Sequence, residues 1–170
     1  MVGSSDPEKC SMNIRTELAS IIDALNAAEV PYALCGGFAV IVHGYVRATQ
    51  DIDILIEERD LDRVRSIVAT LGYNVPGGLL RFQADKDVET RVFRVSKFEN
   101  QDFLTLDLLL VTPVLEEVWA TRQSLTDGQR VLRLVSLSGL RIMKLLAARE
   151  QDLADLAMLD KIAQDTGHGE

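Results

Sequence analysis

LCGGFAVIVHGYVRATQDIDILI, residues 34–56, joins a glycine pair to a pair of acidic residues within one largely apolar stretch. Gly36 and Gly37 separate two short apolar segments, and Asp51 and Asp53 open a run that is otherwise isoleucine and leucine. Glycines permit positive φ angles and let the backbone approach a ligand closely. The pattern predicts a strand, a glycine turn, a short helix and a second strand that carries two carboxylates.

The acidic pair occupies alternate positions of the predicted strand. Side chains two residues apart project from the same face, so Asp51 and Asp53 would point together while Ile52 and Ile54 face the core. Two adjacent carboxylates repel each other unless a cation neutralises them, and Mg²⁺ prefers oxygen ligands of this kind. A structural alternative stays open, in which Asp51 turns the chain into the strand and Asp53 only faces solvent.

A third acid, Asp107, lies inside the apolar segment FLTLDLLLV at residues 103–111. A lone buried carboxylate is costly unless it is paired or bound to a metal. If this segment is a strand beside residues 51–57, Asp107 completes a cluster of three carboxylates. Otherwise Asp107 lies on a solvated face beside Thr105.

The remaining chain alternates between helical and strand patterns, with an apolar period near 3.6 or 2 residues. Helices are predicted at 13–29, 38–45, 59–72, 114–123 and from Ser138 to about Asp165. Strands are predicted at 32–35, 51–57, 79–83, 90–98, 103–111 and 130–136, with NVPGGLL as a loop. This order predicts an α+β fold: a mixed β-sheet with helices mainly on one face and a C-terminal helical unit. We expect a core of residues 1–112 and an extension of residues 113–170 packed on it, as one compact domain.

Composition excludes several classes of protein. Hydrophobic residues make up 47% of the 170 residues, enough for a core, and no apolar run approaches the ~20 residues that cross a bilayer. MVGSSDPEKC has no secretory pattern, which predicts a cytoplasmic location. The net charge of −8 argues against an extended nucleic-acid surface. Cys10 and Cys35 have neither zinc-site spacing nor the pattern of a disulfide framework.

Gly36-Gly37, then Asp51-Ile52-Asp53, then a third acid on a later strand resembles the signature of the DNA polymerase beta nucleotidyltransferase superfamily. HGYVRATQDIDILI is similar to small prokaryotic members, including the toxins of abortive-infection toxin–antitoxin pairs. The resemblance covers residues 30–57 and extends to 102–111 and 136–160. In the last region a helical motif of those toxins is matched by Lys144, Arg149, Asp152 and Asp155. Many members carry serine, whose hydroxyl helps to hold the triphosphate, where this chain has Gly37.

The resemblance implies an enzyme that moves a nucleoside monophosphate from a nucleoside triphosphate to an acceptor. Asp51, Asp53 and Asp107 would bind two Mg²⁺ ions, or Mn²⁺ in their place, and Asp107 would take the proton of the acceptor. The triphosphate would be bound by Gly36, Gly37, Arg47, Thr49, Lys144 and Arg149. A tRNA end, a protein and a small molecule all stay open as acceptors, and a protein partner such as an antitoxin is compatible. The rival hypothesis is a non-catalytic binding or regulatory protein with the same fold.

Structural roles also stay open for several of these residues. Lys144 could extend from a core helix to water, and Arg149 could simply pair with Asp152 across one helical turn. Thr49 could hold the loop before the second strand. For His43, at the end of a short helix, a capping or packed role is favoured over a ligand role.

Overall fold

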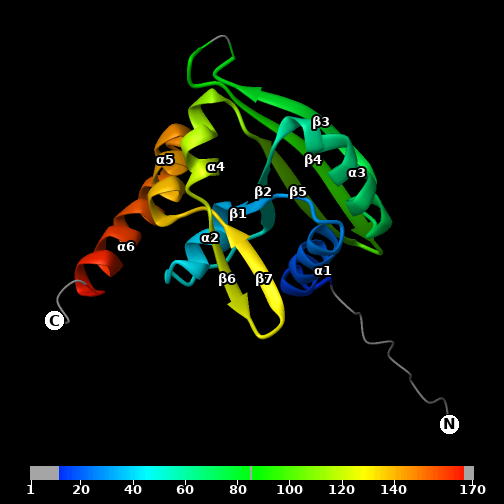
Figure 1. Ribbon diagram of the computed structural model, residues 1–170, viewed down its shortest axis with the longest axis horizontal. Coiled ribbons are helices and arrows are strands. Elements are labelled where there is room, and N and C mark those ends of the chain that lie inside the picture. Colours follow the sequence, from blue (N-terminus) through cyan, green and yellow to red (C-terminus); the bar gives the residue numbers. More distant parts are fainter. Residues whose placement is uncertain (1–11, 85, 167–170) are drawn as a thin grey trace.

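The computed structural model describes residues 12–84 and 86–166, which fold around one seven-stranded mixed sheet (Figure 1). The strands are β1 (Ala33–Cys35), β2 (Asp51–Ile56), β3 (Val75–Phe82), β4 (Thr90–Glu99), β5 (Asp102–Leu110), β6 (Gln123–Asp127) and β7 (Arg130–Leu134). The helices are α1 (Ile14–Ala27), α2 (Gly36–Val42), α3 (Leu61–Thr70), α4 (Glu116–Ala120), α5 (Leu137–Ala147) and α6 (Glu150–Thr166), with 3₁₀ turns at Glu58–Asp60 and Pro113–Leu115. The predicted α+β class with a mixed sheet is confirmed. Cys10 lies outside the described residues.

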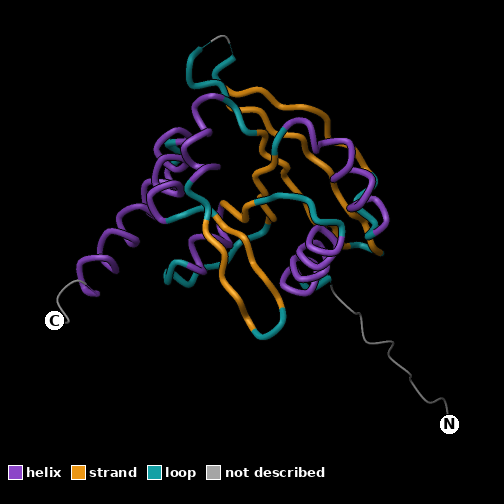
Figure 2. Tube along the Cα trace, viewed as in Figure 1, coloured by secondary structure: helices purple, strands orange, loops and turns teal. Residues whose placement is uncertain are grey.

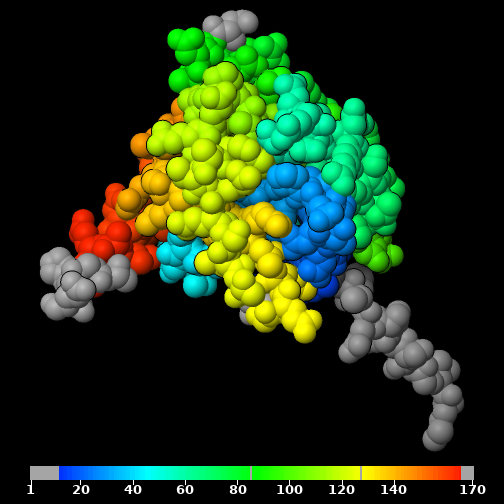
Figure 3. All heavy atoms as spheres, in the orientation of Figure 1, coloured from blue at the N-terminus to red at the C-terminus, as the bar shows by residue number. Residues whose placement is uncertain are grey.

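The strand order across the sheet is β3-β4-β5-β2-β1-β7-β6. β2 pairs with β5 in parallel and with β1 in antiparallel orientation. The long β3–β4–β5 meander forms one side of the sheet, and the β6–β7 hairpin extends from the other (Figures 1 and 3). None of the described helices is both long enough and apolar enough to span a bilayer.

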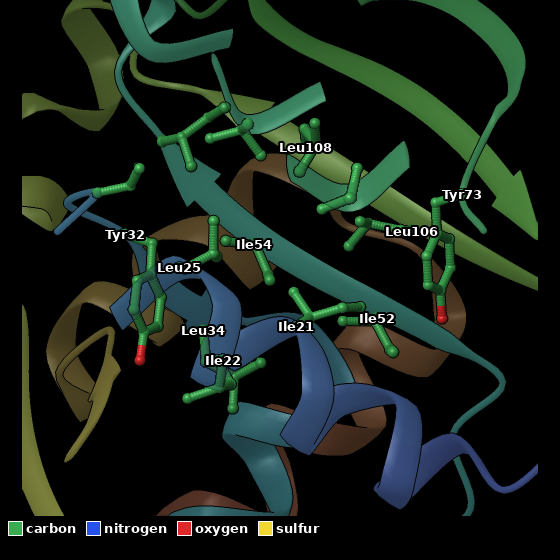
Figure 4. Packing of buried hydrophobic residues seen from close by; sticks show 14 of the residues in the cluster. Ile21, Ile22, Leu25, Tyr32, Leu34, Ile52, Ile54, Tyr73, Leu106 and Leu108 are labelled. Carbon is green, nitrogen blue, oxygen red and sulfur yellow. The ribbon is translucent and has the colours of Figure 1, made fainter. Parts of the chain in front are cut away.

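The alternation of β2 divides its side chains between two hydrophobic clusters. Ile52 and Ile54 are fully buried against Ile21 and Leu25 of α1 (Figure 4). Each such side chain contributes roughly 1.5–3 kcal/mol by leaving water. This packing fixes the register of β2, because a slip of one residue would turn its acids into the core and its isoleucines outward.

The opposite face of the sheet carries the second cluster. There Cys35 and Leu55 pack with Val118 of α4, Leu140 of α5 and Leu159 of α6. Helices therefore cover both faces of the sheet, whereas the sequence predicted helices mainly on one (Figure 2). The acids of β2 share the face of this second cluster, so the C-terminal helices lie over them.

The predicted loop NVPGGLL is wrong, because β3 begins at Val75 and runs through it. Proline and two glycines suggest a turn, but here they form an irregularity in the pairing with β4 between Pro76 and Gly78. An edge strand tolerates both residue types at a bulge. A Cβ on Gly77 would come within 2.9 Å of Arg94 Cγ, so the glycine leaves room for that arginine.

The predicted helix at 114–123 ends at Ala120, and β6 follows from Gln123. β6 and β7 form a hairpin in which Asp127 pairs with Arg130. Gly128 in the two-residue turn has φ +60, a conformation that glycine adopts without strain. The sequence DGQ, residues 127–129, was therefore a hairpin signal that the sequence analysis did not use.

The helical region predicted from Ser138 to about Asp165 is confirmed, but it consists of two helices, because the chain turns sharply between α5 and α6. Ala148 caps α5 in the left-handed conformation, with φ 47. Neither glycine nor proline marks this turn, so local sequence did not indicate it. The turn brings Lys144 of α5 beside Asp152 and Asp155 of α6.

Candidate active site

Three charged side chains and a buried cysteine stand in one row across the sheet. The register pairs Asp53 of β2 with Asp107 of β5, Cys35 of β1 with Asp53, and Arg94 of β4 with Asp107. Asp107 is only 7% exposed, which excludes the alternative of a solvated face beside Thr105, itself 8% exposed. The predicted adjacency of the two acidic strands is therefore confirmed.

The carboxylates of Asp51, Asp53 and Asp107, which we call the acidic row, repel one another. Burial raises the pKa of Asp53 to about 6, and the negative charges of Asp107 and Asp51 add to the effect. Burial, followed by the charge of Asp107, also raises the pKa of the more exposed Asp51. A carboxylate in this condition is stabilised by any cation that binds beside it.

Arg94 is a site residue that the sequence reasoning missed. Its Nε and Nη2 donate to Oδ1 and Oδ2 of Asp107 at 2.8 and 2.7 Å, and this pairing raises the pKa of Arg94. The signal lay in the β4–β5 hairpin, where Glu99 pairs with Asp102 across a two-residue turn. Counting back five residues from Glu99 and forward five from Asp102 aligns Arg94 with Asp107.

The glycine pair lies directly beside the acidic row. Gly36 has φ +61, and a Cβ at this position would overlap Oδ2 of Asp53. A Cβ on Gly37 would overlap Oγ1 of Thr49. The absence of serine at position 37 thus has a steric reason, because the side chain of Thr49 fills the space where a residue with a Cβ would extend.

We expect Gly37→Ala to destabilise the protein by about 1–3 kcal/mol, the usual cost of overpacking. Thr49→Gly alone should lower the stability less than Gly37→Ala does. In the double variant Thr49→Gly should restore at least half of the stability that Gly37→Ala removes, because it deletes the atoms that the new methyl group meets. Urea unfolding of the two single variants and the double variant measures the coupling. Strictly additive losses would show that Gly37 and Thr49 do not constrain each other.

The C-terminal helices contribute a buried network of charges. Lys144 Nζ lies 2.9 Å from Asp152 and 2.8 Å from Asp155, and Arg47 Nη2 donates to Asp155 at 2.8 Å. Arg149 Nε donates to Asp152 at 2.7 Å, so the pairing that was left open as a structural alternative for Arg149 is present. In a straight helix Lys144 and Asp152 would be about 12 Å apart along the axis, so the turn at Ala148 is what lets them meet.

Hydrogen bonding outweighs burial within this network. Burial alone would raise the pKa of Asp152, but Arg149 and Lys144 donate to its carboxylate and hold the pKa below its ordinary value. Asp155 likewise has a lowered pKa, since the hydrogen bonds from Arg47 and Lys144 overcome its burial. Lys144 is 5% exposed, so it does not extend to water, and its partners are carboxylates.

A pocket of about 410 Å³ opens beside the row. Its lining combines polar groups, among them Gly36, Asp53, Asp107, Lys144 and Arg149, with a wall of apolar side chains from the sheet and α5. Arg47 and Thr49 lie beside Gly37 on the loop that enters β2. All nine predicted site residues therefore fall in one region, with Asp51 at the exposed start of β2. His43 caps α2, and its Nε2 lies 2.9 Å from the carbonyl oxygen of Val135. This is the capping role that the sequence analysis favoured over a ligand role.

The donor set suits a divalent cation in part. Asp51 and Asp53 offer carboxylates whose pKa values are raised, first by burial and then by the negative charge of Asp107. Asp107 differs, because Arg94 donates to both of its oxygens. Within residues 12–84 and 86–166, no three His, Cys, Asp or Glu side chains are gathered closely enough to hold a metal. Full ligation by three acids therefore requires Arg94 to share or release Asp107.

The fold is that of the nucleotidyltransferases. The solved structure of TM1012 from Thermotoga maritima matches with TM-score 0.57 and 13% identity over 93% of this chain and 99% of that one. The lincosamide antibiotic adenylyltransferase LnuA, bound to lincomycin, matches with TM-score 0.55 and 18% identity over 86% and 96% of the two chains. The antibiotic-resistance factor ANT(2'')-Ia matches with TM-score 0.59 and 14% identity over 89% and 86%.

The family model of the aminoglycoside-2''-adenylyltransferases matches residues 17–97. These residues hold the glycine pair and the acidic pair that carried the resemblance to the nucleotidyltransferase superfamily. Sequence match and fold agree, so that resemblance is confirmed. No curated protein sequence matches significantly.

Proposed function

We propose that this protein transfers a nucleoside monophosphate from a nucleoside triphosphate to the hydroxyl group of a small molecule. The observation that carries the proposal is the placement of Asp53. This carboxylate is paired in register with Asp107 on a parallel strand, and its other side abuts a glycine turn that has no room for a Cβ. Carboxylates suited to cations and the glycine turn that we propose for the phosphates thus meet at one point.

The chemistry assigned to the site is a displacement at the α-phosphorus. The acceptor oxygen forms a bond to this phosphorus, the bond to the bridging oxygen of the β-phosphate breaks, and pyrophosphate leaves. The acceptor proton passes to a carboxylate of the row, and Asp107 is proposed for this role by its position. Gly36, Gly37 and Thr49 are proposed to hold the phosphates, through backbone N–H groups and a hydroxyl.

Enzymes of this class use divalent metals, and we propose Mg²⁺, with Asp51, Asp53 and Asp107 as the protein ligands. When bound, such ions polarise phosphoryl oxygens and neutralise the charge on the leaving group. Asp51 and Asp53 fit this role as they stand. Lys144 and Arg149 face the same pocket, but their donors are held by Asp152, so we propose that they act chiefly through charge.

A small-molecule acceptor is preferred over a tRNA end or a protein for two reasons. LnuA is described as an adenylyltransferase of lincosamide antibiotics, and the matching family model is named for aminoglycosides. The net charge of −8 disfavours extended contact with RNA. A toxin–antitoxin role, a protein partner and a cytoplasmic location are further proposals, which rest on the toxin-like motif and on composition.

We expect purified protein, incubated with Mg²⁺, cell extract and each α-³²P-labelled triphosphate in turn, to label the low-molecular-weight fraction with one nucleotide. Labelling should stop with EDTA and return with added Mg²⁺. The matched measurement is release of pyrophosphate. Label confined to RNA or protein would contradict the proposed acceptor class, and the absence of any label and pyrophosphate would contradict transfer itself.

The Arg94–Asp107 pair favours a second candidate, a non-catalytic partner protein with this fold. An arginine that donates to both oxygens of a metal-binding carboxylate competes with the metal. This candidate predicts no Mg²⁺-dependent binding of any triphosphate by the wild-type chain, which isothermal titration measures. Stable co-purification with another chain, without nucleotide binding, would support it.

A further inference from the structure

The apolar part of the pocket is a continuous wall of side chains beside the acidic row. Its wall is formed by side chains of three neighbouring strands and of the facing helix α5: Leu80, Phe82, Val92, Leu109, Met143 and Leu146. Phe82 stays 51% exposed although it lines the pocket. Large apolar side chains left open beside a few polar groups are typical of a site for a small ligand, and about 410 Å³ is within the usual size range.

The position of this wall indicates which substrate it would contact. Across the sheet the order is β3-β4-β5-β2-β1. Gly36 follows β1, the paired acids stand on β2 and β5, and the apolar wall continues on β4 and β3. Attacking and leaving oxygens lie roughly in line in phosphoryl transfer. With the phosphates at the glycine turn, the acceptor approaches from the opposite side, over β4 and β3.

The charges of the pocket are balanced. Three carboxylates line it, and two of them already have cationic partners: Asp107 is held by Arg94, and Asp152 by Lys144 and Arg149. Asp53 is the third and is assigned to the metal. The pocket therefore has no surplus of negative charge for a ligand with several ammonium groups, since each such group would need its own anionic partner on leaving water.

Taking the proposed function as its basis, we propose that the acceptor is a neutral or singly charged small molecule whose apolar body packs against Leu80, Phe82 and Val92 while its hydroxyl reaches Asp107. A polycationic aminoglycoside does not match this pocket, although the matching family model is named for that class.

The test compares two probes and two variants with a nucleoside triphosphate bound as its α,β-methylene analogue, using whichever of ATP, GTP, CTP and UTP the wild type binds with Mg²⁺. The probes are 6-phenylhexan-1-ol, a neutral apolar alcohol, and tobramycin, a polycation. Leu80→Glu places a charge in the pocket, and Leu79→Glu places the same charge one residue earlier on β3, outside the pocket lining. We expect the wild type to bind the alcohol and not tobramycin, Leu80→Glu to weaken alcohol binding by about tenfold or more, and Leu79→Glu to change it by less than about twofold.

Titration calorimetry of the analogue and of each probe separates the outcomes. Equal effects of the two glutamates, or tobramycin binding in place of the alcohol, overturn the acceptor assignment while the proposed function stands. Loss of analogue binding in Leu80→Glu alone also overturns it, because the wall would then hold the nucleotide base. Absence of Mg²⁺-dependent binding by the wild type of the α,β-methylene analogue of every one of ATP, GTP, CTP and UTP overturns the proposed function and the acceptor assignment with it. Phe82→Ala, which only truncates an exposed side chain, repeats the comparison if Leu80→Glu does not fold.

Discussion

Asp53→Asn should abolish nucleotidyl transfer and, at the same time, stabilise the metal-free protein. The carboxylate is proposed to bind the metal, so its loss removes several kcal/mol of transition-state stabilisation, about 1,000-fold or more in rate. In the metal-free protein the ionised carboxylate of Asp53 lowers the free energy of unfolding. Its pKa stands near 6 against an ordinary 3.8, which corresponds to roughly 2–3 kcal/mol of unfavourable interaction in the ionised form. Asparagine keeps the shape and removes the charge.

The pH dependence of stability follows from the same shift. Between pH 4 and about 6 the folded protein keeps a proton on Asp53 that the unfolded chain has released. The free energy of unfolding therefore falls as pH rises through this window and stays low above it. The raised pKa of Asp51 acts in the same direction. The lowered pKa values of Asp152 and Asp155 act at lower pH, where protonation of these groups removes stability.

Urea unfolding in EDTA at pH 5 and pH 8, with transfer assayed in Mg²⁺, checks both effects. The stabilising effect of Asp53→Asn should be larger at pH 8 than at pH 5. Asp62→Asn is the matched control, because Asp62 lies on α3 with a 93% exposed side chain, and it should leave transfer and stability nearly unchanged. Transfer at the wild-type rate by the Asp53→Asn variant would remove Asp53 from the site.

The sequence could predict the acidic row because periodicity in a strand is a local property. Residues two apart share a face, so the positions of Asp51 and Asp53 followed from the isoleucines between them. The place of Gly36 followed from the order of elements along the chain. These features depend on neighbours within a few residues, which a single sequence shows directly.

Two features of the site were missed in the sequence analysis. Arg94 was missed because its pairing depends on a residue in another strand, and the turn at Ala148 was missed because no residue type in the local sequence indicates it. The Arg94–Asp107 pair needs the exact register of a hairpin, and an error of one residue would place the arginine on the other face. Ala148 adopts a left-handed conformation that alanine rarely takes. What stabilises it is tertiary, since the turn allows two aspartates of α6 to reach Lys144 of α5. Local propensity in AAREQD favours a continuous helix.

Lys144→Met should destabilise the protein by roughly 3–5 kcal/mol, the usual cost of removing one partner from a buried ion network. Lys144 is 5% exposed, and its two partners, Asp152 and Asp155, are 1% and 0% exposed. Methionine has a similar size and shape, so the loss reports chiefly the charge. Arg47 and Arg149 would remain beside the two acids, which limits the loss but leaves buried lone pairs without a donor.

Lys161→Met is the matched control for Lys144→Met, because Lys161 lies exposed on the neighbouring helix α6 and its replacement should cost less than about 0.5 kcal/mol. The network also bears on the acidic row, since the charge of Lys144 lowers the pKa of Asp53. In Lys144→Met the pKa of Asp53 should rise further, and Mg²⁺-dependent nucleotide binding should weaken most below pH 7. Urea unfolding gives the first effect and nucleotide titration across pH the second. Equal losses in the two variants would show that the buried network does not stabilise the fold, and that the bend between α5 and α6 has another cause.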